Sequence, residues 1–227
     1  AGAPRRYRLT VNLVAVKGLE RAAYLVAAYH WPHMGGAAAV RTGVAWVPPQ
    51  VESALKNSVC AYEACLKPEV LQAMVRDHPL LVTLFQKDKF ADEELGAACL
   101  PLETLLAGRP KFFRCPLTKR TFSKYGDYKA FHKARSTVPP PVKIRVVDSY
   151  LTVFAAGPAA DGPSPYPRGG GGDRAKRAAP ERVCALRAAL TLEDFGPAAR
   201  GEETRLPAPR QSLEDFAAAA AFAAATA

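Results

Sequence analysis

The chain has 227 residues and a formal net charge of +10, with 20 prolines and 16 glycines concentrated toward its C-terminal half. This length allows one well-buried domain with extra segments, or two small domains. The positive charge favours acidic partners: nucleic acid, anionic lipid, or an acidic protein surface such as a tubulin tail. No run of roughly 20 apolar residues is present that could span a bilayer as a helix.

Cysteine usage indicates the redox compartment. The five cysteines are an odd number without CxxC spacing, and most lie in apolar, strand-like runs. We therefore expect reduced core thiols in a cytosolic protein and no zinc site. The chain begins at Ala1 without Met and without a charged and apolar leader, so we expect it to be a fragment of a longer cytoplasmic protein.

Alternating apolar and polar residues predict half-buried strands. In the segment Arg5 to Lys17, Tyr7 and Leu9 face one side, and Arg6 and Arg8 face the other. Similar runs bounded by Gly or Pro predict further strands at 22–31, 40–47, 58–66, 142–155 and 181–192.

A short amphipathic helix and a hairpin follow the strand at 58–66. Pro68 fits the first turn of the helix, and Pro79 closes it. The hairpin occupies Leu80 to Leu102, where two apolar runs flank a charged loop. We predict strands at 80–85 and 95–102, a loop at 86–94 and a helical turn at 101–107.

Two inserts and a tail complete the chain. The segment 111–141 is rich in bases and aromatics, and the Gly/Pro/Arg-rich segment 157–180 is expected to be a disordered linker. In the tail, 197–227, Ser212 and Asp215 resemble a capping box that opens an Ala-rich helix. Eight strands with one helix and long inserts predict an all-β fold, an antiparallel β-sandwich spanning 5–196.

The hairpin in this setting resembles that of a C2 domain, an eight-stranded β-sandwich. In calcium-binding members, a D-x-D loop is followed by a third acid and then by Leu/Ile-Gly, which Leu95-Gly96 matches. Here the three acid positions fall on Gln86, Asp88 and, loosely, Glu93. Calcium needs about six to eight oxygen ligands with several carboxylates, and Lys87 and Lys89 add positive charge instead. The resemblance therefore implies a degenerate calcium loop that does not bind the ion.

A closer similarity depends on short sequence motifs that occur in a fixed order along the chain. The last of them, Thr191-Leu192-Glu193-Asp194-Phe195-Gly196, ends the final strand. The earlier motifs are Lys56-Asn57-Ser58, Pro79-Leu80-Leu81-Val82, Lys87-Asp88-Lys89 and Leu95-Gly96. In this order they resemble the third C2 domain of the centrosomal protein of 120 kDa family, and the similarity covers Arg5 to Gly196.

This resemblance implies a non-enzymatic, calcium-independent interaction domain without cofactors, in a scaffold for centriole and basal-body assembly and elongation. Its partners would be centriolar proteins, including tubulin or microtubules, at the centrosome, the centriole and the ciliary basal body. The helix at 213–227 would lead toward an oligomerising coiled coil outside this fragment. The segments 111–141 and 157–180 have no counterpart that we can match, so any function there is not inherited from the family.

The insert 111–141 is the main candidate binding site. Its bases alternate with aromatics, and Asp127 is its single acid. Such a segment could stack on and pair with an acidic polymer, or it could be a solvated insert whose aromatics pin it to the sandwich. The candidate binding residues are Lys111, Arg114, Lys119, Arg120, Lys124, Lys129, Lys133 and Arg135.

Other partners remain as alternatives. Anionic membrane lipid is the main rival partner for this basic patch, whereas nucleic acid is not expected, because no recognised RNA- or DNA-binding module is present. The hairpin loop is either a recognition tip or a solvated remnant of a calcium loop. Phe90 would favour the first interpretation, because an exposed aromatic on a loop tip can anchor a partner or a membrane.

The pattern of histidines and cysteines does not support catalysis. The histidines at 30, 33, 78 and 132 lack H-x-x-x-H spacing and cysteine partners, so we expect structural or solvated roles. Cys60 and His78 could form a nucleophile and base, but no orienting third group or oxyanion loop accompanies them. We predict a binding domain without a catalytic or metal site.

Overall fold

Antiparallel strands dominate the computed structural model, which describes residues 2–34, 39–89, 91–133, 138–155, 181–199 and Thr204. The longer strands are β1 (Arg5–Lys17), β2 (Ala23–Tyr29), β6 (Val59–Leu66), β7 (Leu80–Lys87), β8 (Asp92–Leu100), β11 (Val142–Ala155) and β12 (Arg182–Pro197). The shorter ones are β3 (Val40–Arg41), β4 (Ala45–Val47), β5 (Ser53–Ala54), β9 (Phe112–Arg114) and β10 (Thr121–Phe122). The helices are a short 3-10 helix, η1 (Pro32–Met34), and three α-helices, α1 (Pro68–Asp77), α2 (Thr104–Ala107) and α3 (Tyr125–Phe131).

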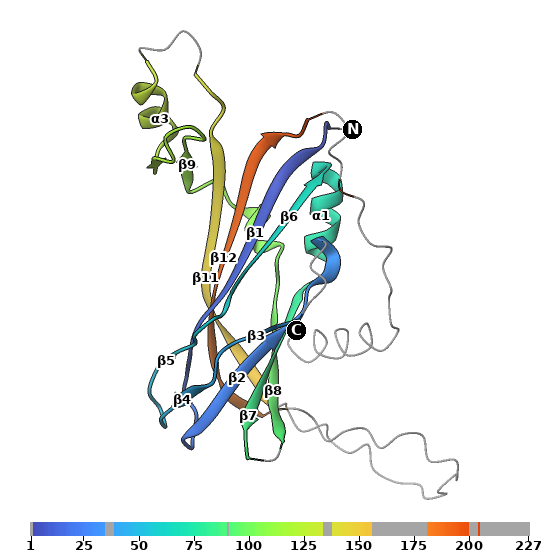
Figure 1. Ribbon diagram of the computed structural model, residues 1–227, viewed down its shortest axis with the longest axis vertical. Coiled ribbons are helices and arrows are strands. Elements are labelled where there is room, and N and C mark those ends of the chain that lie inside the picture. The colour runs from blue at the N-terminus through green and yellow to red at the C-terminus, as the bar shows by residue number, and fades with distance from the viewer. Residues whose placement is uncertain are drawn as a thin grey trace, which may run out of the picture.

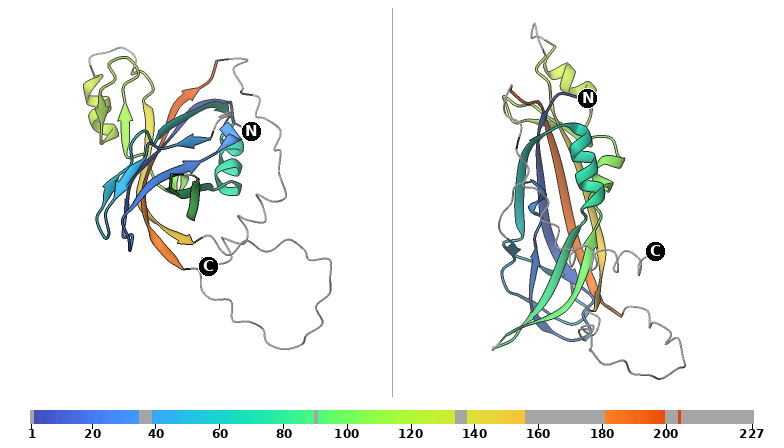
Figure 2. Two further views of the ribbon diagram at one scale, coloured as in Figure 1. Left: turned by 60° about the horizontal axis from the view of Figure 1, so that its bottom comes forward. Right: turned by 90° about the vertical axis from the view of Figure 1, so that its right-hand side faces the viewer.

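The strands form one continuous sheet that curls, so that its two halves face each other (Figures 1 and 2). One half has the order β6-β1-β12-β11, and the other has β8-β7-β2 with β3 and β4 paired to β2. The predicted all-β antiparallel class is confirmed, and the two facing halves form the layers of a β-sandwich.

The core lies between these halves and is built from the inward positions of each strand. On β1, Leu9, Val11 and Leu13 are at most 1 % exposed, as the alternation in this segment predicts. The helix α1 covers the open side of the curl beside β6 (Figure 2) and buries Leu71 and Met74. The helix therefore closes the core where the strands alone leave it open.

Gly96 marks the corner where the two halves join. Among the described residues, strands β11 and β8 pair only through Phe154 with Ala97 and Ala155 with Gly96. A Cβ atom built on Gly96 would lie 2.1 Å from the carbonyl oxygen of Phe154, far inside van der Waals contact. The Gly in the Leu95-Gly96 pair is therefore required by the close approach of two backbones.

Several predicted boundaries differ from the structure. The charged loop 86–94 is shorter than predicted, because Gln86 pairs with Glu93 within the β7–β8 ladder. The strand predicted at 40–47 is interrupted after Arg41, where Thr42 turns to bond with Ala27 through its N–H and its hydroxyl. The last strand continues beyond the predicted residue 192, to Pro197.

Other predictions fall outside the described residues or are met in part. The linker 157–180 and the helix 213–227 lie outside the part that the structure describes. All five cysteines are free thiols, but only Cys115 and Cys184 are fully buried, and Cys60, Cys65 and Cys99 are half-buried. The insert 111–141, for which we made no prediction of helices or strands, contains β9, β10 and α3.

Replacing Gly96 with Ala should destabilise the fold by roughly 3 kcal/mol, near the upper end for overpacking, because the new methyl group would meet the Phe154 backbone. Urea denaturation measures this free energy. The matched control is Gly108→Ala, since a Cβ at Gly108 meets no atom within 4 Å. Equal effects of the two substitutions would contradict the proposed role of the corner.

The fold should also lose stability as the pH falls from about 6.5 toward 4. Burial and the neighbouring His78, which stacks on His33 with ring centroids 3.8 Å apart, lower the pKa of His33 to about 4. The unfolded chain then binds a proton that the folded chain rejects, so folding weakens below the ordinary histidine pKa. We expect a loss of about 1–2 kcal/mol, because His33 is partly exposed. Urea midpoints at pH 7.5 and 5 would show it, and His33→Gln should flatten the dependence.

Candidate functional site

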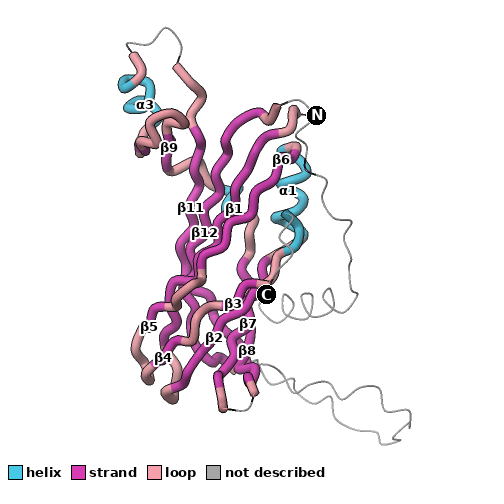
Figure 3. The backbone as a smooth tube through the Cα atoms, in the orientation of Figure 1, coloured by secondary structure: helices cyan, strands magenta, loops and turns pink. Residues whose placement is uncertain are grey.

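The basic insert forms a small module at one end of the curled sheet. Its first strand, β9, pairs with the start of β11 through Arg114 with Val142 and Phe112 with Ile144. Strand β10 then pairs back on β9, and α3 follows (Figures 1 and 3). The module therefore extends the β11 edge and projects beyond the rest of the sheet.

An aromatic cluster holds the module together. Tyr128 on α3 is fully buried, and its hydroxyl donates a 2.6 Å hydrogen bond to the Pro139 carbonyl. The ring of Phe122 on β10 meets it edge-on, with centroids 5.7 Å apart. His132 is also 0 % exposed and packs between the rings of Tyr128 and Phe131. This interior makes the insert a packed unit, unlike a solvated loop.

The order of two strands and a helix is also found in C2H2 zinc fingers, but here the metal ligands are too few. Cys115 and His132 are both buried in the module, whereas a structural zinc site takes about four Cys or His ligands. Among the described residues, no group of three His, Cys, Asp or Glu side chains is placed to hold a metal ion. Aromatic packing takes the structural place that zinc has in such fingers.

A buried carboxylate on β12 connects the module to the sheet. Glu193 is 6 % exposed, and Arg114 on β9 contacts its Oε1 at 2.5 Å. Its other oxygen lies 3.6 Å from the guanidinium of Arg8 on β1. Arg114, one of the predicted binding residues, is half-buried and, through Glu193, connects the module to β12.

The neighbouring acid, Asp194, anchors the ends of β1 and β12. Its two oxygens accept bonds from the Nε and Nη2 of Arg5, both at 3.0 Å, and Oδ1 also accepts the Gly196 N–H. Gly196 has φ of +99°, which few residues other than Gly adopt. Phe195 lies beneath the guanidinium groups of Arg6 and Arg8. The Glu-Asp-Phe-Gly motif therefore anchors the end of β12 to the start of β1.

Sequence reasoning missed this anchoring role. Two adjacent acids at the end of an apolar strand, opposite a strand that begins Arg5-Arg6-Tyr7-Arg8, are the signal that would have found it. Opposite charges on paired strands predict cross-strand ion pairs.

The other predicted binding residues form an exposed cationic surface, which we call the basic module surface. It consists of Lys111, Lys119, Arg120, Lys124, Lys129 and Lys133, all of them exposed. Within the part of the chain that the structure describes, none of the six forms a salt bridge with an acid. The eighth predicted residue, Arg135, lies outside the described residues.

Aromatic rings are interleaved with these cations. The guanidinium of Arg120 lies 5.1 Å from the ring centroid of Phe131, and the Lys129 ammonium lies 4.9 Å from that of Tyr125. Phe131 and Tyr125 are themselves about two-fifths exposed. The basic module surface thus offers point charges and flat apolar faces together, a combination suited to acidic chains or headgroups.

The hairpin loop places its charges differently from a calcium site. A register shift between Leu84 and Phe85 precedes the pairs Gln86 with Glu93 and Lys87 with Asp92, so two of the three expected ligand positions lie within the ladder. The third, Asp88, accepts the N–H of Lys89 at 2.7 Å.

Asp92 is the best-paired acid of the hairpin, and the sequence comparison with calcium loops passed over it. Lys87 Nζ contacts its Oδ1 at 2.8 Å, and Arg41 on β3 binds its Oδ2. These two hydrogen bonds lower the pKa of Asp92. Two protein cations therefore neutralise this carboxylate. The lack of calcium binding stays a prediction, which this charge arrangement favours. Phe90 lies outside the described residues.

The suggested Cys60 and His78 pair has no catalytic geometry in the described chain. His78 stacks on His33, and its carbonyl accepts the Trp31 indole N–H at 3.0 Å. No hydrogen bond joins Cys60 to His78 among the described residues. The absence of enzymatic activity remains a prediction.

Arg114→Ala should destabilise the chain by about 1–3 kcal/mol, because it leaves the buried Glu193 with a single distant partner. Glu193→Gln should also destabilise, and the double variant should lose less than the sum of the two single variants. Chemical denaturation of all four proteins completes the cycle. Additive losses would show that the two side chains act separately.

Comparison with known proteins gives little further information. No family model matches the chain, and no curated protein matches it. No helix in the described residues is long and apolar enough to cross a membrane. Among solved structures, the chain is similar to a C2 domain of RIM from Drosophila, with 14 % identity and a TM-score of 0.29 over 53 % of this chain and 96 % of that one.

Proposed function

We propose that this chain is a calcium-independent C2 interaction domain of a centriolar scaffold, acting in centriole and basal-body assembly and elongation. Its contact with acidic proteins, with tubulin or microtubules as the main candidates, would be made by the basic module surface. The order of the short sequence motifs supports the centriolar assignment. The charge and order of the module support the basic module surface as the binding surface. The proposed location is the cytoplasm, at the centrosome and the ciliary basal body.

The observation that carries this proposal is an ordered module with a surplus of positive charge. Glu193 and the β9–β11 pairing fix the module on the sheet, and its aromatic interior holds its shape. Its six exposed bases can therefore meet a partner without first ordering a flexible loop, which would cost conformational entropy. An acidic tail is extended and multiply charged, so it can meet several bases at once.

Microtubule co-sedimentation tests the proposal. Reversing three bases of the module, Lys111→Glu, Lys119→Glu and Lys124→Glu, should weaken binding about tenfold or more, at roughly 0.5–1 kcal/mol for each altered charge pair. Arg120 and Lys129 are left unchanged, because they pack on aromatic rings. Binding of the parent protein should also fall between about 50 and 200 mM salt, as screening increases.

The control for this experiment makes the same change in net charge elsewhere. Lys56, Arg76 and Lys89 are exposed and lie outside the module, and none of them forms a salt bridge within the described residues. Reversing these three should leave microtubule binding within about twofold. Equal losses in both triple variants would mean that net charge alone drives the association, and the module would then have no special role.

Anionic lipid is the second candidate partner, and the exposed rings favour it. Phe112, Tyr125 and Phe131 are each about two-fifths exposed beside the lysines, as in side chains that enter a membrane interface. Flotation with phosphatidylserine vesicles separates the two partners. Strong flotation that the module variant loses, together with unchanged microtubule binding, would assign the module to membranes.

A further inference from the structure

One serine of the basic module lies among its exposed bases. Ser123 is in the bend between β10 and α3, and its side chain is exposed. Lys119 and Arg120 come four and three positions before it, and Lys124 follows it directly. In the whole sequence, Ser123 is the only Ser or Thr with an arginine three positions before it. Protein kinases that select basic substrates recognise such an arginine with their own carboxylates.

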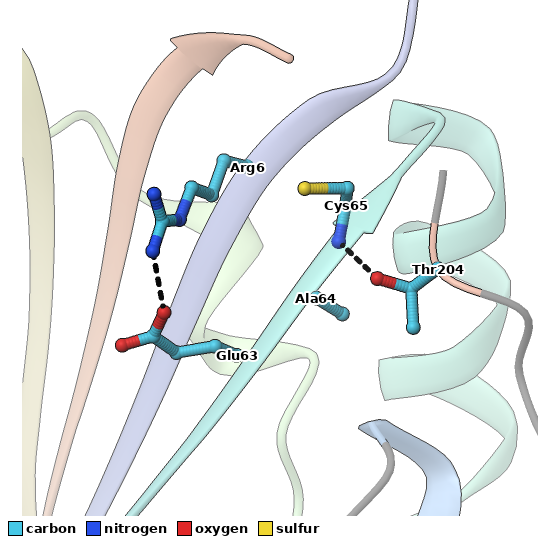
Figure 4. Close-up of a pocket in the computed structure, with 5 residues that line it drawn as sticks. All are labelled: Arg6, Glu63, Ala64, Cys65 and Thr204. Atoms are coloured by element: carbon cyan, nitrogen blue, oxygen red, sulfur yellow. Dashed lines mark hydrogen bonds and ion pairs between the residues drawn. The ribbon is translucent and has the colours of Figure 1, made fainter. Parts of the chain in front are cut away.

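The hydroxyl of Ser123 is available for reaction. It has no hydrogen-bond partner among the described residues. Other hydroxyls of the chain are held: the Thr204 hydroxyl accepts the Cys65 N–H at 2.8 Å (Figure 4), and the Thr118 hydroxyl, in the same module, accepts the Arg120 N–H at 3.5 Å. An enzyme can therefore take up the Ser123 hydroxyl without first breaking a hydrogen bond within the protein.

The chain on both sides of this serine is extended. Strand β10 ends one residue before Ser123 and pairs with β9 on one side. Among the described residues, no strand pairs with the other side of β10. Lys124 is extended as well, with φ of −121° and ψ of 140°. Arg120 is exposed, and its guanidinium lies 5.1 Å from the ring centroid of Phe131. An extended edge segment of this kind leaves its backbone and this guanidinium open to an enzyme.

We propose that Ser123 is phosphorylated by a protein kinase that selects basic substrates, and that its phosphate releases acidic partners from the basic module surface. The Ser123 Oγ forms a bond to the γ-phosphorus of ATP, and the bond from that phosphorus to the β–γ bridging oxygen breaks. ADP leaves, and the hydroxyl proton passes to a carboxylate base of the kinase. The inference rests on the proposed function for the identity of the partner, whereas the modification depends on the module alone.

A phosphate at Ser123 changes the charge of the module in two ways. It adds about −1.5 to −2 charge at neutral pH to a module whose six exposed bases are opposed by Asp127 alone. Its oxygens also accept strong hydrogen bonds from lysine and arginine, and Lys119, Arg120 and Lys124 are the nearest bases along the chain. Bases engaged by the phosphate no longer attract an acidic tail, so phosphorylation acts as an electrostatic switch.

Treatment of the full chain with ATP, Mg²⁺ and the catalytic subunit of cAMP-dependent protein kinase tests the site. Mass spectrometry should locate phosphate on Ser123, and Ser123→Ala should remove most of the incorporation, whereas Thr121→Ala should leave it unchanged. A synthetic peptide of residues 117–127 shows whether the sequence itself is a substrate. Phosphate on the peptide but not on Ser123 of the folded chain would overturn the proposal, and so would its absence from both.

Anisotropy of a fluorescent oligoglutamate peptide measures the effect of the phosphate. At about 50 mM salt, the phosphorylated chain should bind this peptide about fivefold or more weakly than the parent. Ser123→Ala after the same kinase treatment should bind as the parent does. Ser123→Glu should weaken binding more than Gln72→Glu, which makes the same change in charge at an exposed position of α1. Unchanged binding after phosphorylation, or equal effects of the two Glu variants, would overturn the proposed switch.

Microtubule co-sedimentation of the same samples separates this inference from the proposed function. If the parent does not sediment with microtubules but phosphorylation still weakens binding of the glutamate peptide, the proposed partner is wrong and the switch stands. If the parent and the phosphorylated chain sediment equally well, the switch is wrong and the proposed function stands.

Discussion

The approach of Gly96 to the carbonyl of Phe154 is the constraint on which the two-layer arrangement depends. Within the part of the chain that the structure describes, strands β11 and β8 share two residue pairs, and the sheet turns its corner at this contact. A side chain at Gly96 would push these backbones apart, and the inward residues of the two halves, such as Leu84 and Leu190, would no longer meet across one core. The corner also determines where the β7–β8 hairpin leaves the sheet.

That geometry explains why the hairpin tip is chemically different from a calcium loop. The register shift opposite Gly96 leaves Leu95 as the extra residue, and it puts Gln86 and Glu93 on paired strands. Their side chains are thereby fixed along the ladder, while Asp92 is held by Lys87 and Arg41. The hairpin contributes to architecture through Gly96 and uses its best-placed carboxylate for internal ion pairs.

Sequence alone predicted the long strands and α1, because hydrophobic alternation and Pro positions are local signals. Gly96 was singled out only through the resemblance to C2 hairpins. Sequence alone did not predict β9, β10 and α3, since the aromatic residues of that segment pack on one another and leave no simple period. The role of Arg114 depends on Glu193, which lies 79 positions further along the chain (193 − 114) and becomes a neighbour only through the β11–β12 pairing.

The distribution of acids explains how the excess positive charge is displayed. On the sheet, Glu63, Glu193, Asp194 and Asp148 are each bound by arginine. The module has Asp127 alone against its six exposed bases. Acids that stabilise the sandwich are thus unavailable to neutralise the module, and its six exposed bases less Asp127 (6 − 1 = 5) place half of the net charge of +10 at one end of the sheet. A partner with a dense row of carboxylates would meet its strongest attraction there.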